Sequence, residues 1–330
     1  MKKYFVVSCR NAEVAKLVTA VDSKSAVARL EGSSPSPGTI YLMTDKPAIL
    51  VILGPTASGK SDLAVTLAKK LNGEVVSADS RQVYKGLDLG TGKITKKEMG
   101  GIPHYMLDVA SPDRNYSVDR YQKHTYEVID NILKRGKLPI ICGGTGFYIQ
   151  AIVDGLILPE VKVNRPLRIK LAKLGGDDLY KILHKIDAKR ADKIGKENKV
   201  RLIRALEIVA ALGGVPKIKL NPRYTPLQIG LKFEDGMLKD RIKTRLEKRL
   251  KKGMLKETEE LHKNGLSWKR LEGLGLEYRY MAYFLQNKIS REEMERQIKL
   301  VSFQYAKRQM TWFKRDQRIH WIEIQPSDRG

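Results

Sequence analysis

The segment Gly54-Pro55-Thr56-Ala57-Ser58-Gly59-Lys60-Ser61 constrains the fold of this chain more than any other feature of its sequence. It matches the pattern G-x-x-x-x-G-K-[ST], in which a glycine-rich turn joins a buried strand to a helix and cradles phosphate groups. The apolar run Ile49–Leu53 precedes the segment, and leucines at helical spacing follow it. We therefore expect inward-pointing amides around an anion, Lys60 on the outer oxygens and the Ser61 hydroxyl on Mg²⁺.

Further apolar segments indicate strands at Val75–Val76, Leu138–Cys142 and Gln228–Phe233. Helical sequence separates most of them, and such alternation is typical of a parallel sheet covered on both faces. The sequence thus predicts an α/β fold: a P-loop NTPase-like core with a parallel sheet flanked by helices. Basic helices are expected from Lys239 to Asn264 and from Ser290 to Arg315.

Changes in composition along the chain predict its division into domains. Residues 155–222 are charged and mainly helical, and we interpret them as an inserted helical domain; residues 43–154 and 223–330 then form the P-loop core with basic C-terminal helices. Residues 1–42 form an N-terminal extension that ends in a Pro/Ser/Gly cluster at 32–38. Residues 12–38 resemble the conceptual translation of a tRNA gene. We expect this extension not to be native and Met43 to be the start; a genuine extension is the alternative.

The charge of the chain points to its partners. Lysine and arginine number 62 against 37 acidic residues, a net charge of +25, which favours nucleic acid as a partner. A solvated lysine-rich surface is the alternative. Two cysteines, Cys9 and Cys142, cannot build a disulfide framework, and no run reaches the roughly 18 apolar residues of a membrane span. We expect a cytoplasmic protein without a membrane partner.

A P-loop alone does not select a reaction, and its default interpretation is a nucleotide-binding, ATP-dependent kinase or NTPase. Other segments are more specific. They are Val76–Gly86, Gly90-Thr91-Gly92-Lys93, Pro103–Asp108, Gly143–Tyr148, Arg201–Glu207 and Ala306–Phe313. On these segments the chain resembles tRNA dimethylallyltransferases, the tRNA isopentenyltransferase or IPP transferase family. The resemblance covers nearly all of residues 47–322.

The resemblance implies that the P-loop holds the diphosphate of dimethylallyl diphosphate, and that the acceptor is N6 of the adenosine 3′-adjacent to the anticodon in tRNA. It implies three catalytic residues. Asp79 would accept the N6 proton, with a helix N-cap or a water-mediated Mg²⁺ ligand as alternatives. Thr145 would contact the diphosphate, with a simple N-cap as alternative. Arg245 would contact the bridging oxygen of the leaving group, with an RNA-backbone contact as alternative.

The resemblance also implies that residues 43–154 and 223–330 form the catalytic core, and that the insertion at residues 155–222 binds tRNA. Contacts with the anticodon stem-loop of tRNA are expected. The residues concerned are Asp79, Ser80, Arg81 and Gln82 at the target nucleotide, Arg201 and Arg204 on a helix, and Tyr278 and Arg279. Three features depart from the family pattern: Ser61 replaces a threonine, Leu274–Arg279 is longer than the usual motif, and the segment around Val161–Leu174 is short and poor in the family's acidic residues. We expect a monomer. The alternatives are a P-loop kinase of a small molecule, a prenyltransferase acting on free adenylate, and an RNA-binding protein with a vestigial nucleotide fold.

Overall fold

The chain forms two compact units. The computed structural model describes residues 4–8, 39–43 and 46–324. Met1–Gly155 and Pro222–Gly330 make up the first unit, which we call the core unit, and Leu156–Asn221 makes up the second, the inserted unit. Of the extension predicted to be non-native, residues 1–3 and 9–38 lie outside the described residues.

A six-stranded sheet, parallel throughout, forms the centre of the core unit. In sheet order its strands are β10 (Ile319–Glu323), β9 (Thr225–Lys232), β3 (Ala48–Leu53), β6 (Leu138–Gly143), β4 (Gly73–Ser77) and β5 (His104–Tyr105). The central strands β3 and β6 are buried along their whole length. This arrangement confirms the predicted α/β core with a parallel sheet flanked by helices.

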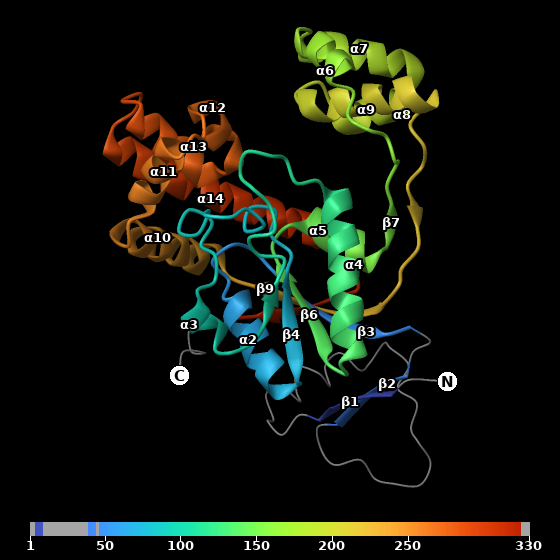
Figure 1. Ribbon diagram of the computed structural model, residues 1–330, viewed down its shortest axis with the longest axis vertical. Coiled ribbons are helices and arrows are strands. Elements are labelled where there is room, and N and C mark those ends of the chain that lie inside the picture. The colour runs from blue at the N-terminus through green and yellow to red at the C-terminus, as the bar shows by residue number, and fades with distance from the viewer. Residues whose placement is uncertain (1–3, 9–38, 44–45, 325–330) are drawn as a thin grey trace. The chain divides into compact units, whose positions relative to one another are not determined.

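Alternate residues of β3 enter two different hydrophobic clusters. Ile49, Val51 and Leu53 belong to a cluster with residues of helices α4 (Val118–Lys134) and α5 (Gly146–Val153). Leu50 and Ile52 belong to a cluster with residues of helix α2 (Lys60–Lys70). Since side chains of a strand alternate between the two faces of a sheet, α2 covers one face and α4 and α5 cover the other (Figure 1).

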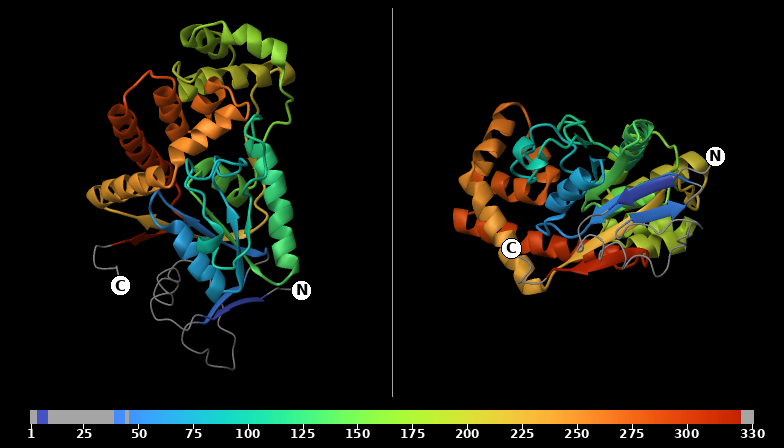
Figure 2. Two further views of the ribbon diagram at one scale, coloured as in Figure 1. Left: turned by 60° about the vertical axis from the view of Figure 1, so that its left-hand side comes forward. Right: turned by 90° about the horizontal axis from the view of Figure 1, so that it is seen from below.

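The remaining helices of the core unit surround the loops at one end of the strands. They are α3 (Lys96–Met99), α10 (Asp235–Lys251), α11 (Met254–Lys263), α12 (Trp268–Leu274), α13 (Leu276–Leu285) and α14 (Arg291–Phe313). Figure 2 shows α10–α13 next to the loops that follow β4. The predicted basic helix at 239–264 is two helices, because Gly253 adopts a φ of 99° between α10 and α11.

The inserted unit has a small hydrophobic core of its own. Its elements are β7 (Leu156–Ile157), α6 (Arg165–Ala172), α7 (Gly176–Ile186), α8 (Ala188–Ile194), α9 (Lys199–Leu212) and β8 (Lys219–Leu220). Leu179, Leu183 and Leu202 are fully buried. The carboxylate of Glu207 is also buried, and it binds both Arg168 and Arg204. The antiparallel pair β7 and β8 closes the unit and sets Leu156 opposite Leu220.

Outside these layers, β1 (Tyr4–Ser8) pairs with β2 (Thr39–Met43) in an antiparallel ribbon. No helix among the described residues has the length and apolar character that a bilayer crossing requires.

Candidate active site

The predicted phosphate loop lies between β3 and α2, as its motif requires. Gly54, Ala57 and Gly59 adopt φ values of 153°, 64° and 82°, conformations that turn the backbone tightly. A side chain at Gly54 would lie 3.0 Å from the carbonyl oxygen of Leu231. Helix α2 begins with Gly59 as its N-cap, and no side chain caps it. The amides of the first turn therefore stay open to an anion, whose charge the helix dipole favours.

A second glycine-rich loop, which follows β6, meets the loop that follows β4. A Cβ atom on Gly143 would lie 2.2 Å from the carbonyl oxygen of Ala78, so only glycine fits. The Thr145 hydroxyl accepts a hydrogen bond from the Ser80 amide at 2.9 Å. Thr145 is the N-cap residue of α5, but its side chain makes no capping hydrogen bond. Its hydroxyl thus joins the two loops instead of capping the helix.

Gln309 of α14 connects the phosphate loop to the second loop. Its Oε1 accepts a hydrogen bond from the Thr56 amide at 2.9 Å, and its Nε2 donates to the Gly144 carbonyl at 2.8 Å. The side chain is 6% exposed. Because a buried amide that satisfies groups on both sides has one favourable geometry, Gln309 fixes the two loops relative to each other.

Asp79 lies at the carboxyl end of β4, in the same pocket as the phosphate loop. Its Oδ1 accepts hydrogen bonds from the amides of Arg81 and Gln82 at 2.8 and 3.3 Å. No described residue donates a hydrogen bond to its Oδ2. The turn therefore holds the carboxylate in place by one oxygen and leaves the other available for a ligand in the cavity.

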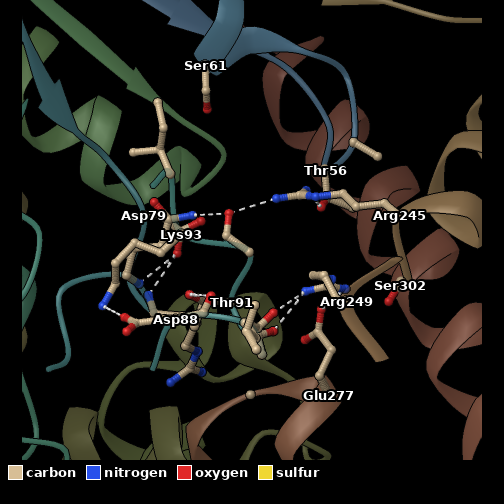
Figure 3. A pocket seen from close by; sticks show the side chains of 18 of the residues that line it. Thr56, Ser61, Asp79, Asp88, Thr91, Lys93, Arg245, Arg249, Glu277 and Ser302 are labelled. Carbon is tan, nitrogen blue, oxygen red and sulfur yellow. Dashed lines mark hydrogen bonds and ion pairs between the residues drawn. The ribbon is translucent and has the colours of Figure 1, made fainter. Parts of the chain in front are cut away.

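Arginines four residues apart on α10 line the facing wall. Arg241 donates to the Ala57 carbonyl at 2.7 Å, and Arg245 donates to Thr56 Oγ1 at 3.4 Å and to the Gly92 carbonyl at 2.8 Å. Arg249 pairs with Glu277 at 3.3 Å. Figure 3 shows Arg245 beside Thr56, and Arg249 beside Glu277. The guanidinium groups of Arg241 and Arg245 are thus held next to the phosphate loop.

Removal from solvent disfavours the charged forms of two partly buried cations of this site, Lys60 and Arg245. Desolvation lowers the pKa of Lys60, and the nearby charge of Arg245 lowers it further. Desolvation also lowers the pKa of Arg245, with Arg249 acting in the same direction. An anion that entered between these side chains would relieve both effects. The two groups therefore favour a ligand of high negative charge.

These walls enclose one cavity of about 530 Å³. Nine lysine and arginine residues line it, against five aspartate and glutamate residues. The cavity brings together Thr56–Ser61 of the phosphate loop, Asp79 and Arg245, while Thr145 reaches it through Ser80. Its size and its excess of positive charge suit a small organic diphosphate.

The residues predicted to contact RNA lie in different surroundings. Arg81 and Arg279 are exposed at the cavity, whereas Tyr278 is 1% exposed and donates its hydroxyl to Glu257 at 2.7 Å. This placement gives Tyr278 a packing role and leaves it almost no surface for RNA. In the inserted unit Arg201 is exposed, while Arg204 is bound to Glu207 and to the Val161 carbonyl.

Two residues that line the cavity, Gln309 and Arg249, were not predicted from the sequence, and neither was Glu257, which binds the amides of Asp88–Gly90 at its edge. Arg249 continues the spacing of Arg241 and Arg245 on α10, and that spacing was a usable signal. Gln309 and Glu257 act through contacts with residues far away in the chain, which no local pattern reveals.

Comparisons with known proteins point to one family. A sequence model of the IPP transferase family matches residues 82–316. A protein of Treponema denticola named tRNA dimethylallyltransferase 2 is 45% identical over 85% of this chain and 97% of its own length. The tRNA isopentenylpyrophosphate transferase of Bacillus halodurans has a similar structure, with a TM-score of 0.65 and 35% identity over 86% of this chain and 93% of its own. A eukaryotic dimethylallyltransferase acting on tRNA reaches a TM-score of 0.75 at 27% identity, over 86% and 75% of the two chains.

Proposed function

Because the chain belongs to the IPP transferase family, we propose that it transfers a dimethylallyl group from dimethylallyl diphosphate to N6 of the adenosine 3′-adjacent to the anticodon in tRNA. The bond between C1 of the dimethylallyl group and the diphosphate oxygen breaks, and a bond between N6 and C1 forms. The N6 proton leaves to a base. The products are N6-dimethylallyladenosine in tRNA and diphosphate.

One observation carries this proposal: an open carboxylate oxygen shares a cavity with a phosphate loop and partly buried cations. Asp79 Oδ2 is free of hydrogen bonds from the described residues, so it can orient the N6 amine and take its proton. Lys60, Arg245 and the α2 amides stabilise the charge that grows on diphosphate as it leaves. Thr145 supports the diphosphate end through the joined loops. Positioning the two reactants supplies the rest of the acceleration.

A magnesium ion fits this site as a partner of the diphosphate. The described residues contain no cluster of three or more histidine, cysteine or carboxylate side chains that could hold a metal by themselves. The cavity does offer the Ser61 hydroxyl on the first turn of α2. Mg²⁺ is commonly bound through few protein oxygens together with substrate phosphates and water. When bound, the ion would supply positive charge to the leaving diphosphate, and Ser61 would hold it.

The RNA contacts proposed here follow charge and exposure. Ser80, Arg81 and Gln82 follow Asp79 at the cavity, where the target nucleotide must enter. Nucleotides in a tRNA loop can leave their stack more easily than paired ones. An adenosine in the anticodon loop can therefore reach the cavity as the acceptor. The inserted unit, with exposed Arg201, is our candidate for binding the anticodon stem. We propose that the enzyme acts as a cytoplasmic monomer.

A labelling experiment tests the proposed reaction. The protein is incubated with dimethylallyl diphosphate carrying a labelled prenyl group, Mg²⁺ and unmodified tRNA, and in parallel with AMP in place of tRNA. We expect label in tRNA, at the adenosine next to the anticodon, and none in AMP. A third reaction with ATP labelled in its γ-phosphate distinguishes phosphate transfer. Label in AMP, or phosphate transfer without prenylation, would refute the proposal.

A further inference from the structure

The loop of residues 88–92 is held from two sides. The amides of Asp88 and Leu89 donate to Glu257 Oε2 at 3.1 and 2.7 Å, and the amide of Gly90 donates to Oε1 at 2.9 Å. On the other side, Arg249 donates to the carbonyls of Leu89 and Gly90 at 3.1 and 3.0 Å. A carboxylate and a guanidinium therefore enclose one short stretch of backbone, and both use charge-assisted hydrogen bonds.

Tyr278 completes this arrangement. Its hydroxyl donates to Glu257 Oε1 at 2.7 Å, and its ring fills the space in which a side chain at position 90 would lie. A Cβ atom on Gly90 would be 2.3 Å from the Tyr278 ring carbon Cζ. The loop can approach α11 and α13 this closely only because residue 90 is glycine.

The far end of the same loop reaches the proposed catalytic arginine. The Gly92 carbonyl accepts hydrogen bonds from Arg245 Nη2 at 2.8 Å and from Gln82 Nε2 at 3.4 Å. Gly92 has a φ of 60°, and a Cβ atom there would lie 2.2 Å from Arg245 Nη2. The position of the Arg245 guanidinium thus depends on the path of this loop.

We propose that Glu257 is a positioning residue, which holds the loop of residues 88–92 so that the Gly92 carbonyl sets Arg245 against the diphosphate. This inference rests on the function proposed above. A long arginine side chain loses much rotational freedom when it binds, and a fixed carbonyl removes that freedom beforehand. The segment Gly90–Lys93, which carries no assigned role in the reaction, would then serve to connect α11 to the phosphate pocket.

The substitution Glu257→Gln tests this role. Glutamine keeps the size of the side chain but presents an NH₂ group to at least one backbone amide, so the loop loses its anionic anchor. We expect kcat/KM for dimethylallyl diphosphate to fall on the order of 100-fold, as misplacement by about 1 Å does. Affinity for inorganic pyrophosphate should fall roughly 10-fold, which corresponds to one misplaced charge contact. Affinity for tRNA should stay unchanged.

Two further variants distinguish a loss of positioning from a loss of folding in Glu257→Gln. Tyr278→Phe removes one hydrogen bond to Glu257 and keeps the ring, so it should weaken pyrophosphate binding in the same direction but less. Gly92→Ala displaces Arg245 without touching Glu257 and should reproduce the kinetic profile of Glu257→Gln. Glu259→Gln is the matched control: Glu259 lies on the same helix, pairs with Lys263 at 2.7 Å, and should behave as wild type.

The outcomes are separable. Wild-type kinetics in Glu257→Gln would overturn the inference. So would a lower Tm with unchanged pyrophosphate affinity in the folded fraction, because a purely structural residue behaves in that way. If the wild-type protein itself transferred no dimethylallyl group, the proposed function would fail, whereas the pyrophosphate measurements would still test the link from Glu257 to Arg245.

Discussion

The substitution Asp79→Asn separates the proposed base from its role in the local turn. Asparagine keeps an Oδ1 acceptor for the amides of Arg81 and Gln82, so the turn and its two hydrogen bonds remain. We expect the free energy of unfolding to change by less than about 1 kcal/mol, the usual worth of a hydrogen bond. Proton transfer, in contrast, loses its acceptor. The rate of transfer should fall by ~10²–10⁴-fold, a barrier increase of about 3 to 5 kcal/mol.

In Asp79→Asn the affinity for pyrophosphate should not fall together with the transfer rate. Desolvation lowers the pKa of Lys60, and the negative charge of Asp79 partly offsets this shift. The same negative charge would repel a bound anion. Its removal should leave pyrophosphate binding equal or tighter, which an unfolded or distorted site would not do. Single-turnover transfer of labelled dimethylallyl to tRNA measures the rate, and calorimetric titration measures the pyrophosphate affinity.

Two companions complete this experiment. Asp79→Ala also removes the two hydrogen bonds of the turn and should lose a further ~2 kcal/mol of stability at similar activity. Asp240→Asn, an exposed carboxylate of α10, should match wild type in all three measurements. If Asp79→Asn kept transfer within threefold of wild type while Asp79→Ala lost it, the carboxylate would serve the turn and not the proton.

Three further predictions concern other parts of the chain. Arg245→Lys loses the planar group that reaches both Thr56 and Gly92, so the transfer rate should fall roughly 100-fold while tRNA affinity, measured by filter binding, stays within threefold. β7 and β8 bring the two ends of the inserted unit together, so a short Gly-Ser linker can replace Leu156–Asn221. This replacement should preserve the affinity for pyrophosphate and weaken the affinity for tRNA, and titrations with both ligands measure the two affinities. Hydrogen bonds from Arg135 lower the pKa of buried Glu74 from 4.5 to about 2. The ionised Glu74 therefore stabilises the fold by about 3 kcal/mol above pH 4.5, and this contribution is lost as pH falls toward 2. In acid unfolding monitored by circular dichroism, Glu74→Gln should show a shallower loss of stability over this range.

The sequence was a good guide where function and fold follow from local pattern. The phosphate loop was predicted because glycine spacing, a buried strand and a helix coincide within twenty-five residues or so of chain. Buried strands such as β3 and β6 were predicted because parallel strands read as continuous apolar runs. β5, of two residues, and β10, which mixes isoleucine with histidine and glutamate, carry no such run and were missed.

The contacts that complete the site could not be predicted in this way. Gln309 meets Thr56 across 253 positions of the chain, and Glu257 meets Leu89 across 168. Neither sequence separation can be recognised from a local pattern, because the packing of whole helices determines which residues meet. The same holds for Tyr278, whose burial follows from the close approach of Gly90 and not from its own sequence motif.

The place of Gln309 on α14 also orders events during synthesis. A ribosome synthesises Gly54–Ser61 long before residue 309. An emerging chain therefore carries its phosphate loop without the side-chain amide of Gln309, which connects this loop to Gly144. Domains fold as their segments emerge, and the pocket can take its final shape only after α14 has left the exit tunnel. Any product of premature termination before this helix would thus contain the most recognisable motif of the protein and yet lack a finished diphosphate site.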